Sequence, residues 1–183
     1  MRFSENRKVA FAVLALAVLV SLFGFGGMGL ARERGKVMKV FNDGADTSLS
    51  VRHSMDAYLD SSAEEAQLMV TEAELHIGQS QLTENVSSLA AKVADSDLDT
   101  RYTAWTDLKS AVDKLSNAMQ QGTTDAEYTN FKIAYRDFWA NEDLIKHDEY
   151  HKLAEDYNGL IGSFPGGVVA SVVGQGALNT FGG

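Results

Sequence analysis

Apolar residues recur at steps of three and four along most of this chain, which is the period of a helix with one buried face. Three such series cover residues 47–93, 97–122 and 124–165, and Gly78 is a weak point within the first. Asp97 or Asp99 is a suitable cap for the second series, which ends at Gly122. The apolar positions of this second series are Leu98, Tyr102, Trp105, Leu108, Val112, Leu115 and Met119. The pattern therefore predicts three long amphipathic helices.

The N-terminal region has a different pattern, because residues 9–30 form a run of 22 residues without a charged side chain. A helix of this length spans roughly 33 Å, which is enough to cross a hydrocarbon core of about 30 Å. Basic residues flank the run in the N-terminal tail, residues 1–8, and in the juxtamembrane segment, residues 31–46. The pattern predicts a transmembrane helix over residues 9–30 and an interruption of helical structure at Asn42-Asp43-Gly44.

Two properties of this predicted anchor stay open. A secretory signal peptide is the alternative, with Gly29-Leu30-Ala31 as its cleavage site, although the apolar run exceeds the usual length of about 7–15 residues. The orientation is also open, because three Lys/Arg residues precede the run and four follow it closely. We expect a single-pass protein of the cell membrane and leave the side occupied by the following domain undecided.

Three amphipathic helices with short connections predict an all-α fold, an antiparallel helical bundle over residues 47–165. The membrane helix can continue through Val37, Val40 and Phe41 and provide a fourth member. The last segment, residues 166–183, is a Gly-rich tail whose one apolar run, Val168–Val173, is too short to cross a bilayer. We expect this run to cap the bundle, to enter a membrane interface or to fray.

Composition narrows the range of functions. The chain has a net charge of −9, but residues 1–39 carry +5 and the other 144 residues carry −14. Such an acidic domain is unsuited to nucleic acid, which is bound through a surplus of Lys and Arg. The absence of Cys excludes disulfides, thiolate zinc sites and a cysteine nucleophile. The expected partners are the lipid bilayer, through residues 9–30, and other proteins or a second copy of the chain.

The pairs Tyr150-His151, Tyr157-Asn158 and Phe164-Pro165 recur at seven-residue steps and lead into an apolar segment that closes on Gly174. This pattern resembles the C-terminal signature of the LemA family. Phe41-Asn42 and Met55-Asp56-x-x-Leu59 are similar to the opening of that family, whereas His151 replaces an Asn and residues 60–64 replace a basic pair followed by Leu-Ile-Pro-Asn. The resemblance implies a membrane-anchored bacterial helical bundle without established catalysis.

The same residues have a direct physical interpretation. Residues seven apart share one helix face, so Tyr150, Tyr157 and Phe164 are expected to form an aromatic ladder that ends at Pro165. Asn158 lies beside this ladder and can bond the backbone of a neighbouring loop. We interpret the set as structural, and a ligand groove at Tyr157 and Asn158 is the alternative.

Two histidines offer the main chemical alternative. His147 and His151 lie four residues apart in a helical pattern, with Asp148 between them, which resembles the His-Glu-x-x-His zinc motif. No third ligand is evident in the sequence, although a bundle can bring His76 close. We expect no catalytic residues, no cofactor and no specific metal site, with weak divalent-cation binding at the two histidines as the alternative.

The predicted function is therefore that of a non-catalytic scaffold for protein interactions or membrane assembly. The alternatives are a membrane-tethered helical sensor that binds a ligand, and a secreted helical protein released by signal-peptide cleavage.

Overall fold

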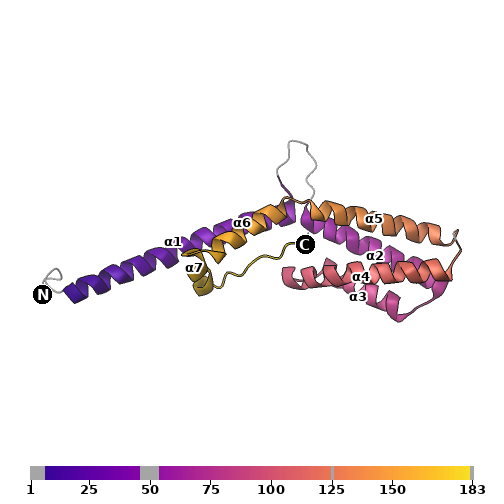
Figure 1. Ribbon diagram of the computed structural model, residues 1–183, viewed down its shortest axis with the longest axis horizontal. Helices are drawn as coiled ribbons and strands as arrows, with labels where there is room; N and C mark the ends of the chain where they lie inside the picture. The colour runs from indigo at the N-terminus through magenta and orange to yellow at the C-terminus, as the bar shows by residue number, and fades with distance from the viewer. Residues whose placement is uncertain (1–6, 46–53, 125, 182–183) are drawn as a thin grey trace. The chain divides into compact units, whose positions relative to one another are not determined.

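A computed structural model describes residues 7–45, 54–124 and 126–181. Within these residues the protein has seven helices and no strand, which confirms the predicted all-α class (Figure 1). The helices are α1 (Arg7–Asp43), α2 (Met55–Ile77), α3 (Gln81–Ala94), α4 (Leu98–Gly122), α5 (Tyr128–Lys146), α6 (Tyr150–Gly162) and α7 (Gly166–Val173). Residues 47–53, where the first predicted amphipathic helix begins, lie outside the described part of the chain.

The contacts divide the chain into two compact units. The anchor unit contains Met1–Lys39 and Lys152–Leu178, and the bundle unit contains Val40–His151 and Asn179–Gly183. The range 47–165 was predicted as one bundle, and the structure groups its last residues with the N-terminal helix. The 27 residues that follow Asp156 carry no charged side chain, so this part of the chain resembles α1 more than it resembles the acidic bundle.

The bundle unit is built on α2, which packs against α3, α4 and α5, while α4 also packs against α3 and α5 (Figure 1). The single helix predicted over residues 47–93 is in fact two helices. Gly78 separates them with φ +78°, a left-handed conformation that favours glycine. The next helix then starts with a capping box in which the Ser80 and Thr83 side chains each accept the other residue's backbone N–H, at 3.3 and 3.0 Å. Because of this division, the bundle unit contains four packed helices, α2, α3, α4 and α5.

Helix α4 matches its prediction closely. The Asp97 side chain accepts hydrogen bonds from the backbone N–H groups of Asp99 and Thr100, both at 3.1 Å, which caps the helix start. The central residues of its apolar series are fully buried, while Leu98 and Tyr102 are partly exposed. These buried residues are Trp105, Leu108, Val112, Leu115 and Met119.

The prediction of a single helix over residues 124–165 is wrong, because the helix is interrupted between Lys146 and Tyr150. Asp148 explains the break. Its Oδ1 accepts a hydrogen bond from the Tyr150 N–H at 2.8 Å and so caps the start of α6. A short polar residue that bonds the backbone locally competes with helix continuation, which the apolar period alone did not indicate.

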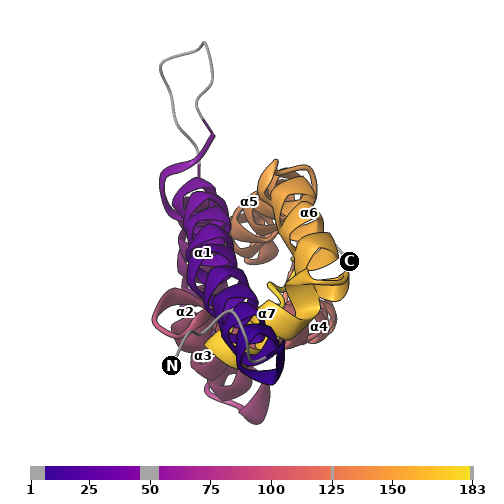
Figure 2. The same ribbon diagram turned by 90° about the vertical axis from the view of Figure 1, so that its left-hand side faces the viewer.

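The anchor unit contains α7 and most of α1 and α6, which lie side by side (Figure 2). Among the described residues, α1 is the one helix long and apolar enough to cross a membrane, and none of its most apolar 18-residue stretch is buried. It continues to Asp43 and ends at the predicted break. The range 166–183 was predicted as a tail, but its first part forms α7, which ends at Gly174 with φ +69°. The residues lining its contact with α1 are Leu22, Phe23, Leu30, Ile161, Val169 and Ala170.

Candidate functional site

Helix α5 carries a row of aromatic side chains along one side. Tyr128, Phe131, Tyr135 and Trp139 follow one another at steps of three and four, so they share a face. The Tyr128 and Phe131 rings stack with centroids 5.5 Å apart, Phe131 and Tyr135 stack at 6.5 Å, and Trp139 meets Tyr135 edge-on at 6.1 Å. Phe131 is fully buried, whereas the other three rings are partly exposed. The row therefore contributes Phe131 to the core and the other three rings to the surface.

Helix α4 fixes the two tyrosines. The Tyr128 hydroxyl lies 2.9 Å from the Ser116 hydroxyl and accepts a hydrogen bond from Gln120 Nε2 at 3.0 Å. The Tyr135 hydroxyl donates to Asp113 Oδ1 at 2.9 Å. Burial, followed by the hydrogen bond to Asp113, raises the pKa of Tyr135, so its hydroxyl stays protonated at neutral pH. The rings are thus held in place before any partner binds.

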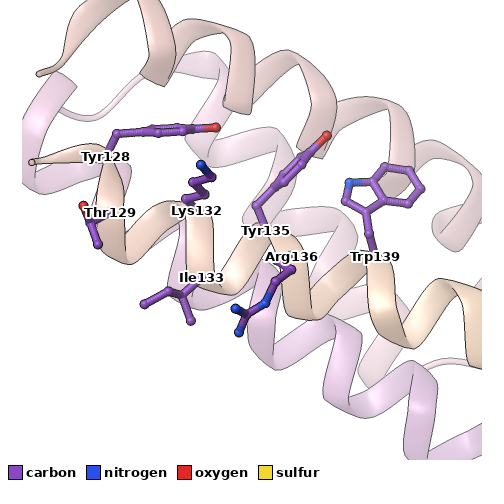
Figure 3. Close-up of a pocket in the computed structure, with 7 residues that line it drawn as sticks. All are labelled: Tyr128, Thr129, Lys132, Ile133, Tyr135, Arg136 and Trp139. Carbon is purple, nitrogen blue, oxygen red and sulfur yellow. The ribbon is translucent and has the colours of Figure 1, made fainter. Parts of the chain in front are cut away.

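Two cations and an aliphatic side chain complete this surface. Lys132, Ile133 and Arg136 are exposed beside the rings and, with Thr129, line an open groove on α5. Figure 3 shows Lys132 projecting to the same side of α5 as Tyr128, Tyr135 and Trp139, with Ile133 and Arg136 on the other side. We call these seven residues the α5 groove. They are Tyr128, Thr129, Lys132, Ile133, Tyr135, Arg136 and Trp139.

The electrostatics of the α5 groove differ from those of the bundle around it. The lining includes Lys132 and Arg136 but no carboxylate, although residues 40–183 carry −14. Arg136 is paired with its neighbour Asp137 at 2.8 Å. Lys132 makes no ion pair with any residue that the structure describes. The groove is therefore an aromatic surface with positive charge on an acidic domain.

The apolar period over residues 124–165 predicts one buried helix face and does not single out Trp139. The signal was present, because Trp139 directly follows the buried Phe138, and two adjacent positions cannot both face the centre of a bundle. Lys132 and Arg136 also recur four residues apart among the rings. The combination of aromatic and basic residues on one helix was the clue to a surface.

The predicted ladder is only partly formed. Tyr150 is buried in the bundle unit, where its hydroxyl donates to the Asn179 carbonyl at 2.8 Å and its ring meets Phe41 edge-on at 5.1 Å. Tyr157 is buried in the anchor unit. Phe164 is 87% exposed, so its place in the ladder is wrong. Helix α6 ends at Gly162, and the heptad spacing no longer applies beyond that residue.

Asn158 behaves as the sequence led us to expect. Its amide bonds the backbone of Leu178, in the segment that follows α7, with both contacts at 2.8 Å. The neighbouring Tyr157 hydroxyl donates to Gln175 Oε1 at 3.4 Å in the same segment. Pro165 occupies the N-cap position of α7. The side chains of Tyr157 and Asn158 thus hold the returning chain in place.

The two histidines do not share a helix face, because the break after α5 lies between them. His147 is exposed and its Nδ1 lies 2.7 Å from the Asp143 carbonyl oxygen. His151 Nε2 lies 2.6 Å from the Ile145 carbonyl oxygen, a position that requires this nitrogen to carry a proton and donate. The described residues contain no group of three or more His, Asp or Glu side chains placed to hold a metal ion. The predicted i, i+4 arrangement is therefore wrong.

One buried cation lies elsewhere in the bundle unit. Arg101 donates to Asp56 through Nη1 and to Asp60 through Nη2, the latter at 2.8 Å, and its guanidinium lies 5.8 Å from the centre of the Phe41 ring. Its side chain is only 8% exposed. The arrangement joins α4 to α2 and is structural, because both carboxylates are occupied by the same cation.

No family model, curated protein sequence or solved structure matches this chain.

Proposed function

We propose that this protein is a single-pass membrane protein of the LemA type whose helical bundle binds other proteins at the α5 groove, without catalysis. The observation that carries the proposal is the groove itself, an aromatic face held rigid by α4 on a domain that is otherwise acidic. The unburied apolar stretch of α1 supports the membrane anchor.

The chemistry of the groove indicates which partner it fits. Three partly exposed aromatic rings and Ile133, which is 47% exposed, offer apolar contact area. The entropic cost of this contact is low at Tyr128 and Tyr135, because hydrogen bonds to α4 already fix both rings. Lys132 and Arg136 favour carboxylates. We therefore infer a protein segment that presents apolar side chains next to Asp or Glu. A second copy of this acidic bundle is a poorer match, because two domains of −14 repel each other.

Site-specific photocross-linking in intact membranes tests this proposal. A photoreactive residue replaces Ile133 in the full chain, and the matched control carries it at Lys92, an exposed position on α3. We expect one discrete adduct from position 133 and none from position 92. Mass spectrometry of the adduct should identify a peptide with apolar and acidic residues around the attachment point.

Two further variants show whether the groove itself makes the contact. Trp139→Ala removes the largest ring and Lys132→Glu reverses the unpaired charge, so each should lower the adduct yield at least about tenfold, as expected when an interface anchor is removed. Lys92→Glu should leave the yield unchanged. The proposal fails if position 133 gives no adduct, or if the yield ignores both groove variants.

A further inference from the structure

We propose that α7 and the turn before it insert into the lipid bilayer beside α1, in the leaflet that contains the C-terminal part of the apolar run. The inference rests on the proposed anchoring by α1. It adds a second membrane-embedded element, one that enters and leaves the bilayer on the same side.

The first observation is where α7 packs. Its contact with α1 lies within the uncharged run of residues 9–30, at Gly26 and Gly27. A Cβ on Gly26 would lie 3.4 Å from the Val169 side chain, and a Cβ on Gly27 would lie 2.9 Å from Val173 Cγ1. A larger residue at position 27 would require Val173 to shift, and small residues at helix contacts are typical of packing in membranes. A helix packed against a membrane-spanning segment at this level is itself at membrane depth.

The second observation is the outer surface of the same element. Four large apolar side chains of α6, α7 and the turn between them have 48–87% of their area exposed, and no charged residue follows Asp156. They are Leu160, Phe164, Val168 and Val172. This surface continues the exposed apolar surface of α1, where Phe25 is 74% and Met28 is 64% exposed. Continuity with the lipid-facing side of α1 favours hydrocarbon as the cover, rather than a separate protein.

The third observation is that several backbone groups of the turn and of α7 are paired internally, which lowers the cost of moving them into a bilayer. The Gly167 N–H donates to the Ser163 carbonyl at 2.7 Å, and the Ser163 hydroxyl donates to the Leu160 carbonyl at 3.0 Å. Pro165 has no N–H to satisfy. At the other end of α7, the Gly174 N–H bonds the Ala170 carbonyl. These internal bonds are kept when the element leaves water.

The position of the α7 contact along α1 determines how deep α7 lies in the bilayer. The α1 residues that contact α7 extend from Leu22 to Leu30, the last residue of the apolar run. The eight steps from Leu22 to Leu30 correspond to about 12 Å along a helix, which is less than one leaflet of about 15 Å. We therefore expect α7 to lie between the headgroups and the bilayer centre, while Lys152, Glu155 and Asp156 of α6 stay in water.

Spin labelling tests this directly, because the chain has no Cys and each introduced Cys is the only one. Val172→Cys and Phe164→Cys in the full chain are labelled with a nitroxide and reconstituted in phosphatidylcholine–phosphatidylglycerol liposomes. Leu16→Cys, near the middle of the apolar run, is the membrane reference, and Ile133→Cys in the α5 groove is the aqueous reference. The measurement is the collision rate of each label with oxygen, which concentrates in lipid, and with a water-soluble nickel chelate.

We expect labels at positions 172 and 164 to favour oxygen over nickel, at a depth shallower than position 16. Nickel accessibility equal to that of position 133, with position 16 still in lipid, overturns this inference and leaves the anchor intact. Protection of positions 172 and 164 from both reagents also overturns it, since it indicates a protein cover. Nickel accessibility at position 16 as well overturns the proposed anchor and, with it, the insertion of α7.

Discussion

Asn158 and Leu178 are joined by two hydrogen bonds that use one side chain to satisfy both backbone groups of one residue. Asn158 Nδ2 donates to the Leu178 carbonyl at 2.8 Å, and the Leu178 N–H donates to Asn158 Oδ1 at 2.8 Å. Leu178 is buried and belongs to no helix. This pair therefore supplies, for an extended segment, the bonds that secondary structure supplies elsewhere.

Replacement of this amide should release the segment. Asn158→Ala leaves two buried backbone groups without partners, so we expect a loss of about 1–3 kcal/mol in local stability. Asn158→Asp keeps the acceptor oxygen but loses the N–H donor. Its local stability should therefore lie between that of the natural chain and that of Asn158→Ala. Hydrogen exchange of the Leu178 amide in detergent micelles measures the effect. Asn117→Ala, at an exposed position of α4, is the control, and equal exchange in all four proteins would refute the assignment.

The buried guanidinium of Arg101 should not be replaceable by an ammonium. Arg101 bonds Asp56 and Asp60 with two different nitrogens, and Lys cannot reproduce that fork. Both carboxylates are partly exposed, so water compensates part of the loss, and we expect Arg101→Lys to cost about 1–2 kcal/mol. Urea unfolding followed by tryptophan fluorescence provides the measurement.

Arg136→Lys is the control for that experiment, since Arg136 is 71% exposed and pairs with its sequence neighbour Asp137. It should change the free energy of unfolding by less than about 0.5 kcal/mol. Equal effects of the two substitutions would contradict the role given to Arg101.

Asp148 should make the bundle unit more stable in mild acid than at neutral pH. Burial raises the pKa of Asp148 above its ordinary value of 3.8, although the Tyr150 N–H and His151 act in the opposite direction. A carboxyl whose pKa is higher in the folded state favours folding when protonated, so this contribution is complete below pH 3.8 and is lost as the pH rises through the raised pKa. Asp148→Asn keeps an oxygen for the Tyr150 N–H and removes the charge.

We therefore expect Asp148→Asn to raise the midpoint of thermal unfolding at pH 7 and to have no effect once the pH is below 3.8. Circular dichroism melts at a series of pH values give the comparison. A variant that is less stable than the natural chain at pH 7 would show that the carboxylate charge stabilises the start of α6.

Two glycines of the anchor unit should respond in opposite ways to alanine. A Cβ on Gly166 would lie 2.0 Å from the backbone carbonyl oxygen of Leu160, so Gly166→Ala must open the turn between α6 and α7. Gly159 lies within α6 with open space around it, so Gly159→Ala should stabilise that helix by about 0.5–1 kcal/mol. Hydrogen exchange of the Gly167 amide, which bonds the Ser163 carbonyl, should be faster than in the natural chain in the Gly166→Ala variant alone when measured in detergent micelles. Equal exchange in the two variants would contradict the close packing of the turn.

The fold was predictable where apolar period and capping agreed. Helix α4 shows this, because its apolar series and the Asp97 cap both appear in the sequence. The division between α5 and α6 was missed, since Asp148 interrupts the helix by bonding one backbone N–H while the apolar residues on either side still fit the period. Gly78 was recognised as a weak point, but the Ser80 and Thr83 capping box that completes the break depends on two local side-chain bonds.

The α5 groove could not be predicted from apolar period and capping in the same way. Tyr128 and Tyr135 have the spacing of core residues, and their partial exposure depends on how closely α5 approaches α4, which is a tertiary property. Phe164 illustrates the opposite error, because a heptad count continued past the end of α6 placed an exposed ring in the aromatic ladder. Asn158 was predicted correctly because a helical amide beside a buried aromatic residue has few partners other than a passing backbone.

Helix α1 should remain part of the protein and hold it in the membrane. Membranes of cells that produce the chain are washed at high pH, and the intact mass of the protein is determined in the pellet and in the supernatant. We expect the full 19.9 kDa chain in the pellet. A soluble protein that lacks the residues up to Ala31 would contradict it and would establish the apolar run as a cleaved signal peptide.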